Sequence, residues 1–245
     1  MEINYNIISK KYDEVREADL ELIKKFEKEI EFNENMRILD FGCGTGNYTN
    51  LLQEITGAKV FGVEPSAGMR QKALAKNKDL IIKTGNHEDI PFDDSFFDFI
   101  YMTDVIHHVP KLNQMFKEFK RVLKNEGLVC IETESHQQID ERFYVKYFPG
   151  TAEVDKKRYP SIDEIVQTAA YNEFSFFKNE FIGGQNKRRV DQAFLKLVEN
   201  KGYSMFHLIS EDEYKNGLIR LKEDLHNGPF AVESSGGTLV WLKRE

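Results

Sequence analysis

The sequence predicts a doubly wound α/β fold, in which a mostly parallel seven-stranded sheet carries helices on both faces. Short apolar segments alternate along the chain with amphipathic segments of helical period. A glycine-rich turn follows the first apolar segment and leads directly into a helical one. Strands and helices that alternate in this way form right-handed crossovers, and such crossovers produce a parallel sheet.

The predicted elements begin with an amphipathic helix at Asp13–Phe32, because apolar residues recur there on one helical face. Five strands then alternate with helices, and two further strands complete the sheet. The strands are expected at Arg37–Phe41, Lys59–Val63, Leu80–Lys83, Phe97–Tyr101, Gly127–Glu132, Phe174–Ile182 and Gly237–Lys243. The helices between them are expected at Asn47–Thr56, Ser66–Asn77, Gln114–Leu123 and Ser161–Tyr171.

Residues 184–235 lie between the last two strands and are too many for a simple loop. They contain two segments of helical pattern, Val190–Glu199 and Glu211–Leu225, so we expect an inserted helical cap on the acceptor side. The whole chain is then one domain, with an N-terminal helical cap at 1–33 and a core at 34–183 and 236–245. Gly183–Asn186 is the expected hinge into the insert.

The charge balance argues against a dedicated nucleic-acid binder, because 34 Lys and Arg stand against 41 Asp and Glu, a net charge of −7. Hydrophobic residues make up 40% of the chain, enough for a real core. No apolar run approaches the roughly 18 residues of a membrane span. Met1–Asp13 lacks the apolar region of a secretory signal, so a cytoplasmic protein is expected.

The two cysteines, Cys43 and Cys130, are too few for a disulfide framework or a four-ligand zinc site. Both lie in apolar stretches, and we expect them to be buried small side chains. No metal site is predicted.

The glycine turn after the first strand is the first candidate binding feature. Gly42 and Gly44 lack the Cβ atoms that keep a ligand away from the backbone, and amides that enter a helix can donate to an anionic group. The spacing is G-x-G-x-G, with Asn47 where a dinucleotide-binding turn has its third glycine. No Gly-Lys-Ser or Gly-Lys-Thr follows, which excludes a phosphate-binding P-loop.

Glu64 ends the second strand, where a carboxylate can accept hydrogen bonds from both hydroxyls of a ribose. An acid in this place can also serve only to lead into the next helix through Pro65 and Ser66. With the glycine turn upstream, we favour the interpretation that Glu64 binds a nucleoside sugar.

Together these residues resemble the class I S-adenosylmethionine-dependent methyltransferases, especially the branch with the quinone-biosynthesis type of methyltransferase domain. The resemblance covers Met36 to about Ile131, and its motifs occur in order. They are Ile38–Gly46, Val60–Ser66, Gly85–Phe92, Ser95–Asp98, Asp104–Val109 and Glu118–Lys124. The resemblance implies the Rossmann-like methyltransferase fold, S-adenosyl-L-methionine as cofactor and S-adenosyl-L-homocysteine as product.

The resemblance also implies a cofactor site. Gly42, Cys43 and Gly44 would pack against the methionine part, with Asp40 near its amino group, and Glu64 would bind the ribose. The turn at Asn86 and His87 would hold adenine, and Thr103 would lie by the sulfonium. Asn86 stands where the family has Asp, but an amide oxygen can still accept from the adenine amino group. Three further residues complete the expected set: Tyr12, Pro65 and Met69.

Methyl transfer from a sulfonium is an in-line displacement, for which alignment and exclusion of water supply much of the acceleration. A general base is therefore optional. His107 and His108 follow the fourth strand on the ligand side, and they are candidate catalytic bases near neutral pH. A structural or cofactor-side role for them stays open.

The acceptor is expected to be a small molecule, such as a quinone-like ring, or a peptide. The aromatic cluster Phe143–Phe148 is a candidate pocket wall, and Lys187–Arg189 a candidate anion contact, although core packing and a solvated helix start are the alternatives. Two rival functions remain, a non-catalytic cofactor-binding partner protein and an NAD-dependent oxidoreductase. The sequence does not predict the oligomeric state.

Overall fold

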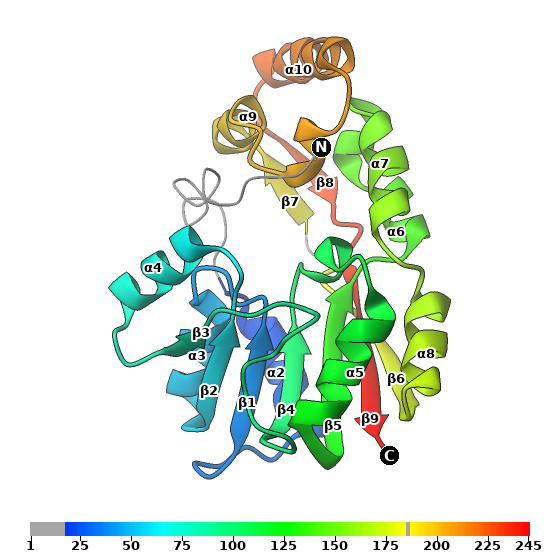
Figure 1. The fold of residues 1–245 in the computed structure, drawn as a ribbon. Coiled ribbons are helices and arrows are strands. Elements are labelled where there is room, and N and C mark those ends of the chain that lie inside the picture. The colour runs from blue at the N-terminus through cyan, green and yellow to red at the C-terminus, as the bar shows by residue number, and fades with distance from the viewer. Residues whose placement is uncertain (1–17, 185–186) are drawn as a thin grey trace. The chain divides into compact units, whose positions relative to one another are not determined.

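A seven-stranded sheet forms the centre of the fold in the computed structural model, which describes residues 18–184 and 187–245 (Figure 1). The strands lie in the order β3-β2-β1-β4-β5-β9-β6. Their bounds are β1 Arg37–Phe41, β2 Lys59–Val63, β3 Ile81–Lys83, β4 Phe97–Met102, β5 Leu123–Thr133, β6 Phe174–Ile182 and β9 Gly237–Arg244. The predicted doubly wound, mostly parallel α/β fold is confirmed.

The described residues divide into two compact units. The α/β unit comprises residues 18–133, 162–180 and 239–245, and the second unit comprises 134–161, 181–184 and 187–238. Each unit has its own hydrophobic cluster.

The strand order reverses direction at β1. From β1 the chain moves outward through β2 to β3 and then returns to place β4 on the other side of β1. The pairs β1–β2, β1–β4, β2–β3 and β4–β5 are all parallel, whereas the arrow of β9 points the opposite way in Figure 1. In open α/β sheets, ligands bind outside the carboxyl ends of the strands at such a switch point. The site is therefore expected at the ends of β1 and β4.

Helices cover both faces of the sheet, and the central strands are accordingly buried along nearly their whole length rather than on alternate residues. On one face, Phe26 of α2 (Leu20–Glu29) packs on Phe99, Tyr101 and Trp241, with ring centroids 5.2, 5.3 and 5.8 Å away. On the other, Phe41 meets Phe119 of α5 (Leu112–Val122) at 5.1 Å between ring centroids. The helices of this unit are α2 Leu20–Glu29, α3 Asn47–Thr56, α4 Ala67–Lys76, α5 Leu112–Val122 and α8 Ile162–Tyr171, with a 3₁₀ turn η1 at Ile106–His108.

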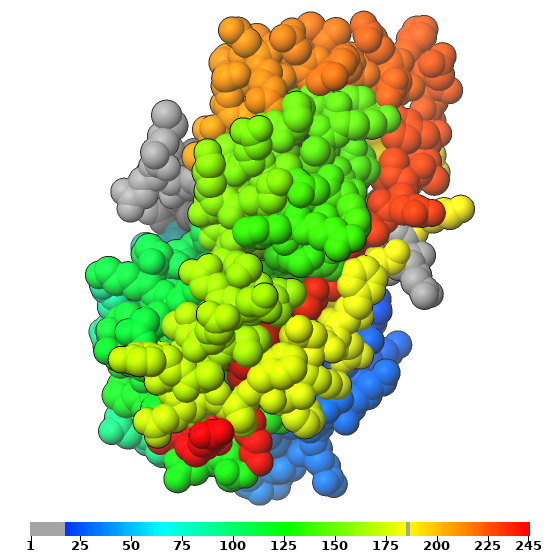
Figure 2. Space-filling model, turned by 90° about the vertical axis from the view of Figure 1, so that its right-hand side faces the viewer, coloured from blue at the N-terminus to red at the C-terminus, as the bar shows by residue number. Residues whose placement is uncertain are grey.

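Strand β6 lies at one edge of the sheet. Figure 2 shows it in yellow beside α8, with the red end of β9 next to both. Three of its aromatic residues are exposed, Phe176 by 48%, Phe177 by 51% and Phe181 by 55%.

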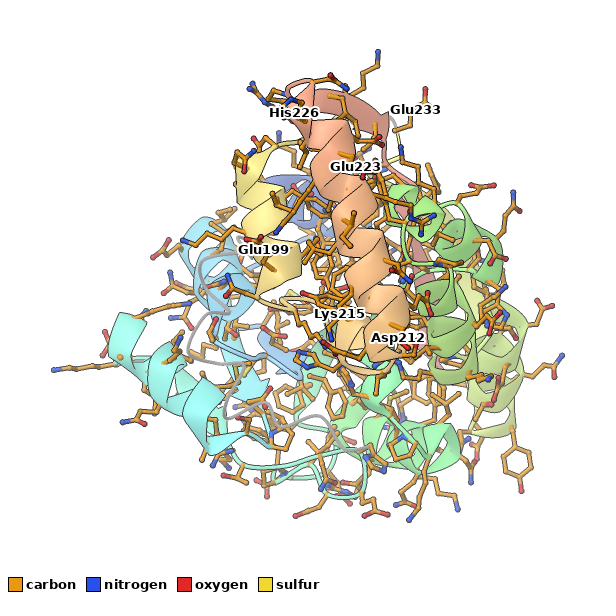
Figure 3. The ribbon with its side chains drawn as sticks, turned by 90° about the horizontal axis from the view of Figure 1, so that it is seen from above. Glu199, Asp212, Lys215, Glu223, His226 and Glu233 are labelled. Atoms are coloured by element: carbon orange, nitrogen blue, oxygen red, sulfur yellow. The ribbon has the colours of Figure 1, made fainter. Side chains whose placement is uncertain are left out.

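The second unit joins two segments that are distant in sequence. The first contains α6 His136–Asp140, η2 Phe143–Lys146 and α7 Gly150–Arg158. The other contains β7 Lys187–Val190, α9 Gln192–Glu199, η3 Ser204–His207, α10 Glu211–His226 and β8 Phe230–Glu233. Figure 3 shows α10 seen from above, from Asp212 near its start to His226 at its end.

The core of the second unit is aromatic and contains buried charge. Phe206 meets Phe148 at 5.0 Å and Tyr214 at 6.2 Å between ring centroids. Arg142 is buried and donates through Nη1 to Asp155 Oδ2 at 2.5 Å. The same guanidinium binds Glu134, and Arg158 donates to the other oxygen of Asp155.

The second unit differs from the predicted insert in extent and content. Residues 134–161 belong to it, and β7 and β8 form an antiparallel pair, from Lys187 opposite Glu233 to Val190 opposite Phe230. The prediction of a mostly helical segment missed this pair because its strands are far apart in sequence. The role of residues 184–235 as an acceptor-side cap stays a prediction. The division into a cap at 1–33 and a core also stays a prediction, because residues 1–17 lie outside the described part. Residues 185 and 186 of the predicted hinge Gly183–Asn186 lie outside it as well.

The starts of one strand and one helix also differ from the predicted positions. β5 begins at Leu123, four residues before the predicted start at Gly127, and α5 begins at Leu112 instead of Gln114. Among the described residues, no helix is both long enough and apolar enough to cross a membrane.

Candidate functional site

The turns after β1, β2, β3 and β4 carry the predicted site residues. The parallel register places Phe41 opposite Val63 and Asp40 opposite Tyr101, so these strands end at the same edge of the sheet. All predicted cofactor residues except Tyr12, which lies outside the described residues, belong to the α/β unit.

The glycine turn is tied to the next strand and adopts left-handed backbone. The amides of Gly42 and Cys43 both donate to Val63 O, at 2.8 and 3.1 Å. Gly42 has φ +77°, and a Cβ built on it would lie 2.6 Å from Val105 Cγ2. Gly44 has φ +55°. Glycine is therefore required at position 42 by its backbone and by the close approach of Val105.

The Glu64 carboxylate is held by backbone amides from two different turns. Gly44 N donates to Oε2 at 3.0 Å, and Ser66 N donates to Oε1 at 2.7 Å. Arg70 fixes the same loop through its Nη1, which donates to the carbonyl oxygens of Glu64 at 2.7 Å and Pro65 at 2.8 Å. Each carboxylate oxygen has a second lone pair, so the group remains able to accept from a ligand.

Burial is the main influence on the pKa of the Glu64 carboxyl, because Glu64 is only 8% exposed. Burial raises the pKa of the carboxyl, while the amides of Ser66 and Gly44 and the nearby Arg70 lower it. The donors partly offset the cost of holding a charge here.

Asp40 supplies a second carboxylate at this edge. It is buried on β1, and the hydroxyl of Thr49 on α3 donates to its Oδ2 at 2.6 Å. Burial raises the pKa of Asp40 to about 6, and the charge of Glu64 adds to the rise. The group is therefore mostly ionised at pH 7.

The turn after β3 is closed by its own backbone. Asn86 N donates to Asp89 O at 3.0 Å, and Asn86 Oδ1 accepts from Glu88 N at 2.7 Å. Asn86 is nevertheless exposed, and its oxygen has a second lone pair. His87 is half-buried; burial lowers its pKa, and its Nε2 has no hydrogen-bond partner among the described residues. A buried ring nitrogen without a partner fits a turn that receives a polar ligand.

The segment after β4 carries Thr103 and the two histidines. Asp104 has φ +57°, a left-handed turn that leads from the strand into η1. The ring centroids of His107 and His108 lie 3.9 Å apart, with His107 half-buried and His108 exposed. Their catalytic role stays a prediction.

Three further residues predicted to contact the cofactor, Cys43, Pro65 and Met69, differ in how exposed they are. Cys43 is buried, and a Cβ on Gly62 would lie 2.5 Å from its Sγ. Burial raises the pKa of the Cys43 thiol well above its ordinary value, so it is a packing group, as expected for both cysteines. Met69 is 2% exposed, which leaves little side-chain surface for a ligand, whereas Pro65 is exposed.

Several residues that shape this site were not predicted from the sequence: Thr49, Ser66, Arg70 and Val105. Ser66 carried a usable signal, because its side chain caps α4 by accepting from Met69 N at 3.3 Å. Val105 acts on Gly42 from a distant part of the chain. Thr49 and Arg70 bind Asp40 and Glu64 O from nine and six residues away, and no motif of the sequence predicts these contacts. Within residues 18–184 and 187–245, no group of three or more His, Cys, Asp or Glu is arranged to hold a metal ion.

A family model described as a methyltransferase domain matches residues 39–131, the segment that contains the glycine turn, Glu64 and the Asn86 turn. This match, together with the fold, supports the assignment of the chain as a class I S-adenosylmethionine-dependent methyltransferase. Methyltransferases of this class carry a cofactor of the S-adenosylmethionine type.

Curated relatives agree with this family. Demethylmenaquinone methyltransferase of Staphylococcus aureus strain MRSA252 is 28% identical over 198 residues, which are 76% of this chain and 80% of the relative. The enzyme of the same name from Shouchella clausii strain KSM-K16 is 28% identical over 218 residues, with 82% and 89% covered.

A solved structure has the same fold. A candidate methyltransferase of an antibiotic biosynthesis pathway from Anabaena variabilis ATCC 29413 superimposes with a TM-score of 0.74 at 24% identity. The match covers 92% of this chain and 98% of that one.

Proposed function

We propose that this methyltransferase transfers a methyl group from S-adenosyl-L-methionine to a small organic acceptor by in-line displacement. The observation that carries the proposal is the Glu64 carboxylate, which follows β2 beside the switch point and is oriented by Gly44 N at 3.0 Å and Ser66 N at 2.7 Å. A carboxylate held in this way accepts from a ribose without having to reorganise.

The residues present fit the cofactor. Glu64 would accept from the ribose hydroxyls, and Asp40 would attract the ammonium of the methionine part. Asn86 and His87, with its unpartnered Nε2, would contact adenine. S-Adenosylmethionine supplies an electrophilic methyl group on its sulfonium, and the product is S-adenosyl-L-homocysteine.

The remaining roles concern the reacting end. Gly42, Cys43 and Gly44 would lie along the methionine part, and Thr103 near the sulfonium. His107 and His108 are the candidate bases for an acceptor that must lose a proton. Tyr12, Pro65 and Met69 remain proposed cofactor contacts.

The class of acceptor is a more specific proposal than the methyltransferase activity itself. Relatives named demethylmenaquinone methyltransferases support a quinone-like ring as the acceptor class. A cytoplasmic location also stays a prediction.

Calorimetric titration with S-adenosylmethionine tests the cofactor site, with NAD as the control ligand. We expect the wild type to bind S-adenosylmethionine and not NAD. Glu64→Ala should weaken this binding at least tenfold, about 1.4 kcal/mol. The matched control Glu27→Ala removes an exposed acid of α2 and should bind as the wild type does.

Three outcomes separate the alternatives. Equal binding by Glu64→Ala and the wild type, or binding of NAD, contradicts the proposed site. Transfer of a labelled methyl group to a demethylated naphthoquinone supports the acceptor class. Binding of the cofactor with no transfer to any acceptor supports a non-catalytic partner protein.

A further inference from the structure

Two side chains of α5 are bound to the loop that follows β3. Arg121 donates from Nη2 to Ile90 O at 2.7 Å, and from Nη1 to Phe92 O at 2.7 Å and to Asp94 Oδ1 at 3.0 Å. Glu118 accepts Ile90 N on Oε2 at 2.9 Å. Both residues lie in the motif Glu118–Lys124, to which the cofactor site assigns no role.

Glu118 and Arg121 also form a bidentate ion pair with each other. Arg121 Nε donates to Glu118 Oε1 at 2.9 Å, and Nη2 donates to Oε2 at 2.7 Å. The side chains are 13% and 32% exposed, so the pair is largely shielded from water. The guanidinium lowers the pKa of Glu118, which keeps the carboxylate charged at neutral pH.

The loop is fixed on its remaining side as well. Lys83 Nζ donates to Pro91 O at 2.8 Å. A Cβ built on Gly85 would lie 2.7 Å from Asp89 O, so the turn is tightly closed at its base. The carbonyl groups of Ile90, Pro91 and Phe92 are therefore all occupied, whereas the tip at Asn86 and His87 still presents polar groups that can accept or donate.

The distance along the chain from this anchor to the tip is short. Ile90 is three residues beyond His87 (90 − 87 = 3), and Asp89 closes the turn on Asn86 through two backbone hydrogen bonds, of 3.0 and 3.3 Å. A shift of Ile90 must therefore move the groups at the tip.

We propose that Glu118 and Arg121 are positioning residues that hold the Asn86–Ile90 turn in the shape that recognises the adenine base. This rests on the proposed function, in which Asn86 and His87 contact adenine. Neither side chain needs to touch the cofactor, since both act through the backbone of Ile90. The pair should control which purine is accepted more than how well the rest of the cofactor binds.

The test compares S-adenosylhomocysteine with S-inosylhomocysteine, in which a carbonyl oxygen replaces the adenine amino group. Calorimetry gives the ratio of the two affinities for each variant. Arg121→Met keeps an aliphatic stem and removes the donors, and Lys117→Met is the matched control on an exposed position of the same helix. We expect the wild type and Lys117→Met to prefer the adenine ligand at least tenfold, and Arg121→Met less than threefold.

A merely structural role gives a different result. In that case Arg121→Met either lowers the affinities for S-adenosylhomocysteine and S-inosylhomocysteine by the same factor or changes neither of them. A ratio of affinities equal to that of the wild type overturns the proposal. Equal affinities in the wild type also overturn it, because the turn then does not discriminate the base. Loss of both ligands in the wild type shows instead that the proposed function has failed.

A second variant protects the test against misfolding. Glu118→Gln keeps an oxygen for Ile90 N but removes the charge that binds Arg121, and it should give an intermediate ratio. Hydrogen exchange of the Ile90 amide should be faster in both variants than in Lys117→Met. Unchanged exchange in Arg121→Met and Glu118→Gln contradicts the anchoring role directly.

Discussion

The two compact units use buried polar groups in opposite ways. In the α/β unit, Glu64 is held by single donors from Gly44 and Ser66, which leave acceptor capacity for a ligand. In the second unit, Arg142 and Asp155 are buried against each other, 7% and 2% exposed. The first arrangement leaves lone pairs free to accept from a ligand, as the proposed function requires, whereas the second is satisfied by side chains of the protein itself.

This difference suggests that the Glu64 carboxylate serves ligand binding, whereas the Arg142–Asp155 pair serves the stability of the fold. Buried charges must be paired or hydrogen-bonded, so a carboxylate with spare acceptor capacity at a sheet switch point indicates a ligand. A guanidinium saturated by Glu134 and Asp155 indicates a structural role. Substitutions in the two units should therefore affect different measurements.

Asp155→Ala should give the largest effect. The change removes the carboxylate that Arg158 binds and one of the two that bind Arg142, which keeps only Glu134. Breaking a buried pair costs about 3–5 kcal/mol of unfolding free energy. Urea denaturation measures the loss, and Glu153→Ala, an exposed acid on the same helix, is the control. Cofactor affinity of the folded variant should change less than about twofold. A large loss of affinity with little loss of stability would reverse the assignment of the two units.

Gly62→Ala tests the packing beneath the glycine turn. The added Cβ would lie 2.5 Å from Cys43 Sγ, and overpacking of this kind costs about 1–3 kcal/mol. Cys43→Ala in the same chain removes the sulfur and should restore most of the stability in a denaturation experiment. If the double variant is no more stable than Gly62→Ala, the sulfur is not the obstacle.

The pH dependence of cofactor binding tests Asp40, with the smallest expected effect. Its pKa is raised to about 6, so the carboxylate that we propose to attract the cofactor ammonium is mostly protonated at pH 5. Affinity for S-adenosylmethionine should be about tenfold weaker at pH 5 than at pH 7, roughly 1.4 kcal/mol. Asp40→Asn should be weak at both values, and a variant that keeps the wild-type pH dependence would exclude Asp40.

The same raised pKa has the opposite effect on folding. Between pH 3.8 and about 6 the folded chain keeps a proton on Asp40 that the unfolded chain has released. The contribution of Asp40 to the unfolding free energy therefore falls as the pH rises through this range.

The α/β unit was largely predictable because its signals are local. The strand Arg37–Phe41, the glycine turn and Glu64 each follow from residues adjacent in sequence, and the parallel sheet follows from their order. The contacts that complete the site are not local. Val105 excludes a side chain at Gly42 from 63 residues away (105 − 42 = 63), and no sequence pattern contains that relation.

The second unit was less predictable for the same reason. Strand β7 consists of Lys187, Arg188, Arg189 and Val190, a cationic run typical of a solvated helix start. It is a strand because Phe230–Glu233 supplies its hydrogen-bond partners from a distant part of the chain. Helix α6 does carry a local signal, a capping box between Ser135 and Gln138.

The most direct measurement of the central claim is a crystal structure with S-adenosylhomocysteine bound. We expect both ribose hydroxyls within about 3 Å of the Glu64 carboxylate oxygens, with the amides of Gly44 and Ser66 still donating to the same group. A ribose bound elsewhere, with Glu64 facing only those two amides, would contradict it.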